Sequence, residues 1–102
     1  MATKLEAADI ERRMRDVQNW RLCGEAIERT YDREDFDGSI AFVNDVARAA
    51  NRADHHPDIS VAWNKVTLRL SSHDAGGLTE RDFALAAVLD AIAAEGEGRA
   101  AS

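Results

Sequence analysis

Residues 60–70 constrain the fold most, because apolar and polar residues alternate along them on both sides of Asn64-Lys65. A period of two is typical of β-strands that bury one face, and Asn tolerates the positive φ of a tight turn. We therefore expect a β-hairpin with a two-residue turn at Asn64-Lys65. In this register Trp63 lies opposite Val66, and the apolar residues of both strands share one face.

The three histidines of the chain, His55, His56 and His73, flank this predicted hairpin. In the same register Ile59 lies opposite Leu70. Extended toward the open end of the hairpin, this register places His56 opposite His73, with backbones about 5 Å apart. His55 then lies beside them. The sequence therefore predicts that imidazoles far apart in the chain meet at the open end of the hairpin.

The remaining elements are predicted from hydrophobic periodicity and from capping residues. Asp35 is a typical helix N-cap, and Thr79-Glu80-Arg81-Asp82 resembles a capping box. Helices are expected at residues 5–17, 35–52 and from 79 to about Glu95-Gly96, and strands at residues 20–23 and 26–31. With the hairpin, this order predicts an α+β fold whose antiparallel sheet is covered by helices.

Length and charge limit the classes of protein to consider. The 102 residues suit one domain that spans the whole chain, with residues 97–102 expected to form a frayed tail. A formal net charge of -6 argues against direct binding to nucleic acid or to an anionic membrane. The single cysteine, Cys23, excludes an internal disulfide. No apolar run approaches the ~20 residues of a membrane span, and residues 1–6 lack the apolar core of a signal peptide. We therefore expect a cytoplasmic protein.

The histidines allow three interpretations. Each could be structural or simply exposed, and Asp82 could be no more than a helix cap. A zinc site is a second interpretation, but His55 and His56 are adjacent, and neighbours on an extended chain point to opposite faces. Acid–base chemistry is the third, because an unperturbed histidine has a pKa of about 6.5. The convergence of all three histidines beside the Gly-containing residues 75–77 favours acid–base chemistry.

Three segments resemble the signature of the pterin-4a-carbinolamine dehydratases: His55-His56-Pro57-Asp58, Trp63-Asn64-Lys65-Val66 and residues 70–82. The resemblance implies a four-stranded antiparallel sheet with three helices packed on one face, assembled as a homodimer or homotetramer. It also implies dehydration of 4a-hydroxytetrahydropterin to the quinonoid dihydropterin, which recycles the cofactor of aromatic amino acid hydroxylases. The implied partners are the pterin substrate and such a hydroxylase. No metal or organic cofactor is implied.

The resemblance further implies roles for individual residues. His55 and His73 correspond to an acid–base pair, in which one imidazole assists departure of the 4a-hydroxyl while the N5 proton is lost. His56 would bind substrate, and Asp82 matches an acid that could orient a histidine. The expected catalytic residues are His55, His56, His73 and Asp82, and the expected substrate-binding residues are Asn51, His55, His56, Pro57, Trp63, Ser72, His73, Asp74 and Ala75.

Two positions depart from the pattern of this family. Many members have a glutamate near the pterin four residues before the first histidine, where this chain has Asn51. An aromatic residue often follows the proline by two positions, where this chain has Ile59. The first departure could weaken pterin anchoring or shift substrate preference, and the second removes a stacking surface.

A catalytically idle interaction module is the alternative function. Such a protein would keep the fold and act as a coactivator or as a partner of a hydroxylase. Direct DNA binding is a third candidate, which the net charge of -6 disfavours.

Overall fold

The computed structural model describes residues 3–101, so Met1 and Ala2 at one end and Ser102 of the predicted tail lie outside the described residues. The predicted order of elements is confirmed. The elements are α1 (Ala7–Met14), β1 (Arg21–Cys23), β2 (Ala26–Asp32), α2 (Phe36–Ala53), β3 (Asp58–Ala62), β4 (Lys65–Leu70), the short 3-10 helix η1 (His73–Ala75) and α3 (Glu80–Ala101).

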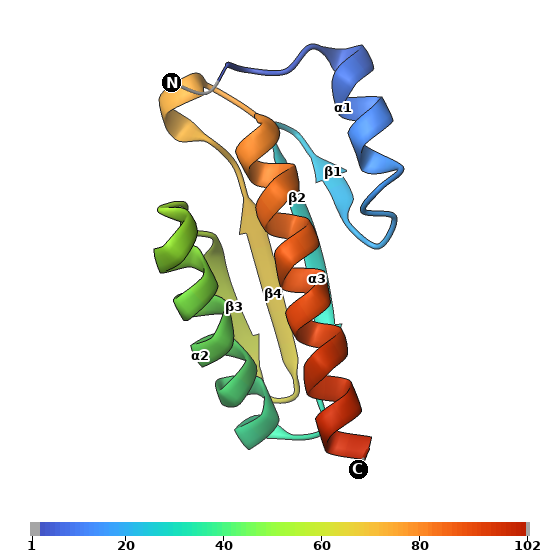
Figure 1. Cartoon of the computed structure of the whole chain (residues 1–102), viewed down its shortest axis with the longest axis vertical. Coiled ribbons are helices and arrows are strands. Elements are labelled where there is room, and N and C mark those ends of the chain that lie inside the picture. The colour runs from blue at the N-terminus through green and yellow to red at the C-terminus, as the bar shows by residue number, and fades with distance from the viewer. Residues whose placement is uncertain (1–2, 102) are drawn as a thin grey trace.

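The four strands form one antiparallel sheet in the order β1-β2-β4-β3. Figure 1 shows α2 and α3 lying side by side along one face of this sheet, with α1 beside β1. Ile10 and Met14 of α1 pack against the same core as the other two helices. The expected α+β fold is therefore confirmed.

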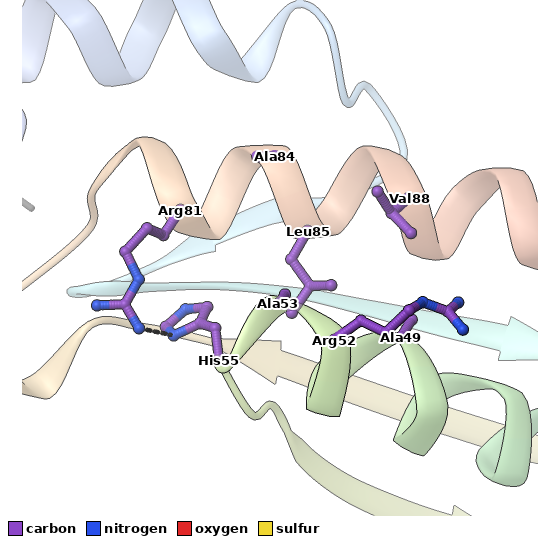
Figure 2. A pocket seen from close by; sticks show the side chains of 8 residues that line it. All are labelled: Ala49, Arg52, Ala53, His55, Arg81, Ala84, Leu85 and Val88. Atoms are coloured by element: carbon purple, nitrogen blue, oxygen red, sulfur yellow. Dashed lines mark hydrogen bonds between the residues drawn. The ribbon is translucent and has the colours of Figure 1, made fainter.

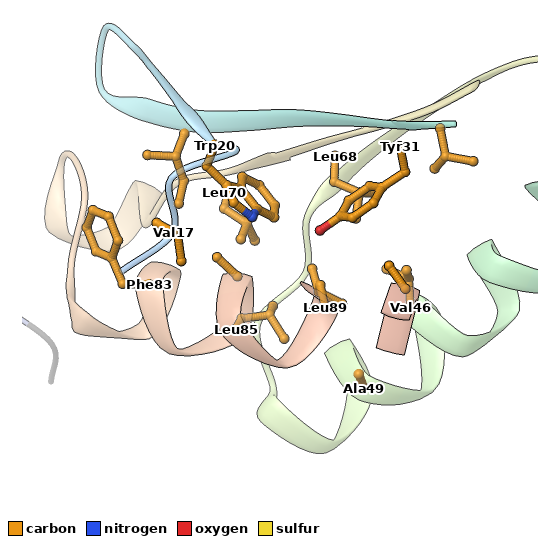
Figure 3. Close-up of a cluster of buried hydrophobic side chains, with 14 of the residues drawn as sticks. Val17, Trp20, Tyr31, Val46, Ala49, Leu68, Leu70, Phe83, Leu85 and Leu89 are labelled. Carbon is orange, nitrogen blue, oxygen red and sulfur yellow. The ribbon is translucent and has the colours of Figure 1, made fainter. Parts of the chain in front are cut away.

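The hydrophobic core lies between the sheet and the helices α2 and α3. Figure 3 shows side chains of β2 and β4 pointing toward those of the two helices. Its buried side chains include Trp20, Ile27, Tyr31, Phe42, Val46, Leu68, Leu70, Phe83, Leu85 and Leu89. The opposite face of the sheet carries mainly polar side chains, as the alternation along the strands predicts. A row of Cα partners on that face runs Arg21, Glu28, Arg69, Asp58 across all four strands.

The Asp90 carboxylate of α3 accepts hydrogen bonds from three side chains at the edge of the core. Asp90 Oδ1 accepts hydrogen bonds from Trp20 Nε1 (2.9 Å), from Arg29 Nη1 (2.7 Å) and from the Tyr31 hydroxyl. Burial, and then the hydrogen bond to the Asp90 carboxylate, raise the pKa of Tyr31. This cluster joins α3 to β2 and to the residue that precedes β1.

The turn of the β3–β4 hairpin differs from the predicted one. Ala62 pairs with Lys65 and Val61 with Val66, so the turn residues are Trp63 and Asn64. The prediction of a turn at Asn64-Lys65 was wrong by one position. As a result, each residue of β3 pairs with a residue of β4 two positions earlier than predicted. Because the side-chain period is also two, the apolar residues still share the core face.

Tertiary hydrogen bonds explain where the turn lies. Trp63 takes a positive φ of 50°, and its carbonyl accepts from Ser39 Oγ of α2 at 2.7 Å. Asn64 Nδ2 donates to the Arg33 carbonyl (3.2 Å), while the Arg33 N–H donates to the Asn64 carbonyl (2.6 Å). These contacts come from the chain before α2 and from its first turn. They outweigh the local preference for a positive φ at Asn64.

Two helix boundaries also differ from the prediction. Helix α1 covers only Ala7–Met14 of the predicted residues 5–17, and α3 continues to Ala101 rather than ending near Glu95-Gly96. Helical backbone therefore covers most of the predicted tail. None of the helices in residues 3–101 combines the length and apolar character that crossing a bilayer requires.

Candidate active site

The first turn of α3 is fixed by reciprocal capping, as the sequence predicts. The Thr79 N–H donates to Asp82 Oδ2 at 2.9 Å, and Thr79 Oγ1 accepts from the Arg81 N–H at 3.2 Å. Asp82, at the third helical position, thus accepts the hydrogen bond from the N-cap backbone N–H that a Glu accepts in the usual capping box. Its negative charge also lies where the helix dipole favours it.

The same carboxylate connects two other segments. Asp82 is fully buried, and Oδ2 accepts from Ser72 Oγ at 2.9 Å while Oδ1 lies 2.5 Å from His55 Nε2. A buried charge is tolerated when hydrogen bonds replace its hydration, and Asp82 has three. Asp82 therefore holds the segment after α2 and the segment after β4 against the start of α3.

Both ring nitrogens of His55 have partners. The Asp82 carboxylate can only accept a hydrogen bond, so Nε2 carries a proton. Nδ1 lies 3.2 Å from Arg81 Nη2, which can only donate, so Nδ1 accepts. His55 is 7% exposed, and its backbone N–H bonds to the Ala50 carbonyl at the end of α2. The hydrogen bonds thus define one tautomer and one orientation of this ring.

A cavity of about 370 Å³ lies between α2 and α3, with His55 and Arg81 at one end. Figure 2 shows the His55–Arg81 hydrogen bond at that end and Arg52 on the α2 side. The remaining lining residues are Ala49, Ala53, Ala84, Leu85 and Val88. The lining of this cavity is mainly apolar.

A second and more polar pocket, of about 170 Å³, lies at the end of the sheet where β3 begins and β4 ends. We call it the histidine pocket, because His56 and His73 both line it. The other lining residues are Glu25, Ala26, Asp58, Arg69 and Ser71. His56 Nε2 is 3.0 Å from Asn51 Oδ1, which orients its ring from the last turns of α2.

The loop that carries His73 is closed on itself. Ser72 and Gly77 exchange backbone hydrogen bonds of 3.1 and 3.3 Å, and between them η1 makes one tight turn. Gly76 ends this turn at φ 77°, a conformation that glycine adopts without steric cost. Because Ser72 is anchored on Asp82, the position of His73 depends on the same buried carboxylate.

The predicted site residues are only partly brought together. His56 and His73 share the histidine pocket, whereas His55 lines the cavity between the helices. The predicted pairing of His56 with His73 across the hairpin is wrong, because the observed register, continued beyond β3, aligns His56 with Ser71. Trp63 lies at the other end of β3 and is 67% exposed. Four strand residues, at about 3.3 Å each, lie between Trp63 and Asp58 of the histidine pocket.

The other predicted residues do not line the histidine pocket themselves. Ser72 is buried, and its hydroxyl donates to Asp82. Asn51 contacts His56, and Pro57 follows His56 directly. Asp74 and Ala75 belong to η1, where Asp74 Oδ2 lies 3.6 Å from Arg81 Nη1.

The sequence did not predict five of the residues that line the histidine pocket: Glu25, Ala26, Asp58, Arg69 and Ser71. Arg69 and Ser71 follow from alternation, because both lie on the polar face of β4 and its continuation. Glu25 had no local signal. It reaches the pocket because the β1–β2 turn lies beside the end of β4, as the pairing of Ile27 with Leu70 requires.

No group of three or more His, Cys, Asp or Glu side chains in the described part of the chain is arranged to hold a metal ion. The histidine pocket presents two imidazoles, two carboxylates, a guanidinium and a hydroxyl. Imidazoles can donate or accept a proton near neutral pH.

The fold and the pocket define a class of small α+β proteins with a histidine-lined polar pocket at one end of an antiparallel sheet. Residues 3–92 match the family described as "Pterin 4 alpha carbinolamine dehydratase", and the chain belongs to that family. A protein of Thermosynechococcus vestitus assigned as a pterin-4-alpha-carbinolamine dehydratase is 45% identical over 93 residues, covering 91% of this chain and 98% of its own. One of Roseiflexus castenholzii with the same assignment is 51% identical over 92 residues, covering 90% and 99%.

Solved structures that are similar to this one include the following two. The crystal structure of a transcriptional coactivator/pterin dehydratase from Brucella melitensis superposes with a TM-score of 0.85 at 31% identity, covering 89% of this chain and 99% of that one. A pterin dehydratase-like protein identified as a RuBisCO assembly factor in the alpha-carboxysome gives a TM-score of 0.63 at 24% identity, covering 74% and 89%. At that identity the second likeness shows the shared fold alone.

Proposed function

We propose that this protein dehydrates 4a-hydroxytetrahydropterin to the quinonoid dihydropterin and so recycles the cofactor of aromatic amino acid hydroxylases. Membership of the family supports the reaction. The observation that carries the mechanism is that His56 and His73, from segments seventeen positions apart, line one polar pocket.

The reaction needs two proton movements and no redox change. The bond from C4a to the hydroxyl oxygen breaks, the N5–H bond breaks, and a C=N bond forms between C4a and N5. One imidazole, as its imidazolium, donates a proton to the departing hydroxyl, which leaves as water. The other accepts the N5 proton. Histidine suits both tasks, since its proton affinity is matched to neutral pH.

In this proposal His73 and His56 contact the substrate, and His55 and Asp82 hold them in place. His55 directly precedes His56, and Ser72 directly precedes His73. Asp82 bonds to both preceding residues, at 2.5 and 2.9 Å. A direct proton-transfer role for His55 together with His73, which the resemblance implies, stays a prediction. Asn51, Pro57, Asp74 and Ala75 would shape the pocket around the ring.

The test is a rate measurement with 4a-hydroxytetrahydropterin generated by a hydroxylase. We expect the protein to accelerate loss of the carbinolamine absorbance well above the uncatalysed rate. His73→Ala should lose most of this acceleration, since general acid–base catalysis typically contributes 10²–10⁴-fold. Ser60→Ala, which changes the same sheet face outside the pocket, should keep it. An unaccelerated reaction with folded protein would contradict the proposal.

We propose further that the protein acts in the cytoplasm as a homodimer or homotetramer. The outer edge of β3 has no partner strand within residues 3–101, and the nearby Ile59 is 39% exposed. An uncovered edge with apolar neighbours favours pairing with another chain. Light scattering across a concentration series would measure the state, and a monomer at all concentrations would contradict it.

The interaction module remains the second candidate function, because the Brucella melitensis relative is described as a transcriptional coactivator as well as a pterin dehydratase. This candidate predicts no acceleration of dehydration and stable binding to a protein partner such as a hydroxylase. Co-purification with the hydroxylase, combined with the rate measurement, separates the two functions.

A further inference from the structure

A pterin ring presents hydrogen-bond donors along one edge, so its recognition requires hydrogen-bond acceptors in the pocket. The 2-amino group and N3–H lie side by side, and a carboxylate accepts from such a pair of donors with two parallel hydrogen bonds. Asn51, the expected anchor, is an amide rather than a carboxylate, and its Oδ1 already lies 3.0 Å from His56 Nε2. The donor edge therefore needs another acceptor.

Glu25 supplies a carboxylate on the side of the histidine pocket away from His56. It lies in the β1–β2 turn, and its carbonyl accepts from Ser71 Oγ at 2.7 Å, which ties this turn to the floor of the pocket. Strands β2 and β3 lie on opposite sides of β4. Two strand spacings, about 9–10 Å, thus separate the backbones that carry Glu25 and His56. A flat bicyclic ring fits between side chains placed on these two walls.

The other charged groups of the pocket are less suited to this task. Asp58 lies two residues after His56, on the same wall as the reacting centre. The Arg69 guanidinium is a donor and lies 3.6 Å from Glu28 Oε2. Arg69 therefore cannot accept from the amino edge.

The carboxylate of Glu25 is free to change partner. Within the described part of the chain it forms one ion pair, with Lys4 Nζ at 3.9 Å, which joins side chains that are 71% and 54% exposed. Exposed pairs of this kind are weak. Lys4 reaches this position because its stem lies over Gly77, where an added Cβ would come within 2.9 Å of Lys4 Cε.

We propose that Glu25 is a specificity-determining residue that binds the 2-amino and N3–H edge of the pterin. This inference rests on the proposed function and extends it to the class of ring accepted. The site prefers 2-amino-4-oxo rings, which offer two donors, to 2,4-dioxo rings such as lumazine. In lumazine an oxygen replaces the amino group and faces the carboxylate.

Dissociation constants for pterin and lumazine, measured from ligand fluorescence, test this preference without any turnover. We expect the parent protein to bind pterin about tenfold or more tightly than lumazine, the loss expected for a charge-assisted hydrogen bond. Glu25→Gln should reduce the ratio to about threefold or less, because a glutamine amide can serve either ring. The matched control Glu34→Gln removes a charge at the far end of β2 and should leave the ratio unchanged.

The outcomes separate this inference from the proposed function. If the parent prefers pterin and Glu25→Gln keeps the same preference, the role of Glu25 is wrong while the dehydratase proposal stands. If the parent binds the two rings equally, the recognition inference is also wrong. If the parent neither binds pterin nor accelerates dehydration, both proposals fail together.

Discussion

His55 Nε2 lies 2.5 Å from Asp82 Oδ1, and both side chains are buried. This contact joins the end of α2 to the start of α3, and His55 directly precedes His56, which lines the histidine pocket with His73. A carboxylate that is a helix cap by its sequence position is also the anchor of the candidate site. The two roles are compatible, because one carboxylate can accept from several donors at once.

Removal of this carboxylate should cost much of the stability of the fold. Asp82→Ala leaves donors of Thr79, Ser72 and His55 without their acceptor. We expect the free energy of unfolding to fall by about 3 kcal/mol in urea titrations. Asp82→Asn, which keeps one oxygen, should lose less. The exposed Glu11→Ala serves as the control and should change stability by less than about 0.5 kcal/mol. An unchanged midpoint for Asp82→Ala would contradict the anchor role.

His55→Ala and His73→Ala should differ in stability although both lose most of the dehydration rate. His55 is buried on Asp82, so its loss leaves a buried carboxylate with one partner fewer, at about 1–3 kcal/mol. His73 is exposed in η1, and its loss should cost less than about 0.5 kcal/mol. Circular dichroism and urea titration measure the folding of each variant. Full activity in both folded variants would refute the histidine assignment.

The single tyrosine gives a pH-dependent test of the core. Burial and the Asp90 carboxylate raise the pKa of Tyr31 above its ordinary value. Below pH ~10 Tyr31 is protonated in both the folded and the unfolded state, so its contribution to the free energy of unfolding is fully present. Above pH ~10 the unfolded chain loses its phenolic proton first, and stability falls as pH rises toward the folded-state pKa.

Ultraviolet titration of the tyrosinate band should therefore show no ionisation of the folded protein near pH 10, and ordinary ionisation in urea. Tyr31→Phe should remove this part of the alkaline loss of stability. Tyrosinate formation near pH 10 in the folded protein would contradict the Asp90 cluster.

Gly76 tests whether the loop of His73 depends on its backbone conformation. Its φ is 77°, and a Cβ added at this residue would point into open space, so the cost of Gly76→Ala comes from the backbone alone. We expect about 1–2 kcal/mol. Gly76→Asn should cost less, since Asn tolerates this region. Thermal or urea unfolding of the two variants measures the difference. Equal effects of the two substitutions would show that conformation is not the cause.

Local rules predicted much of this structure from sequence. Alternation indicated the faces of β3 and β4, and the residue types at Asp35 and Thr79 indicated the starts of two helices, since Asp35 Oδ1 accepts from the Gly38 N–H at 2.8 Å. The turn at Trp63 could not be predicted, because its position is decided by hydrogen bonds from Ser39 and Arg33, which are distant in sequence.

The candidate site was predicted less completely than the fold. The motif around the histidines identified His56, His73 and Asp82, but not that His55 turns toward the cavity between the helices. Glu25 belongs to a turn with no motif, and only the order of strands brings it to the histidine pocket. Side-chain direction at the end of a strand and contacts between separate turns are tertiary properties.

The most direct test of the account is a double-mutant cycle on dehydration by His56→Ala, His73→Ala and the two together. Residues that act as one unit give strongly non-additive losses. We predict that the double variant is about as slow as the slower single variant, with all three folded. Two single variants that keep the parent rate, or losses that simply multiply, would contradict joint action of these histidines in one pocket.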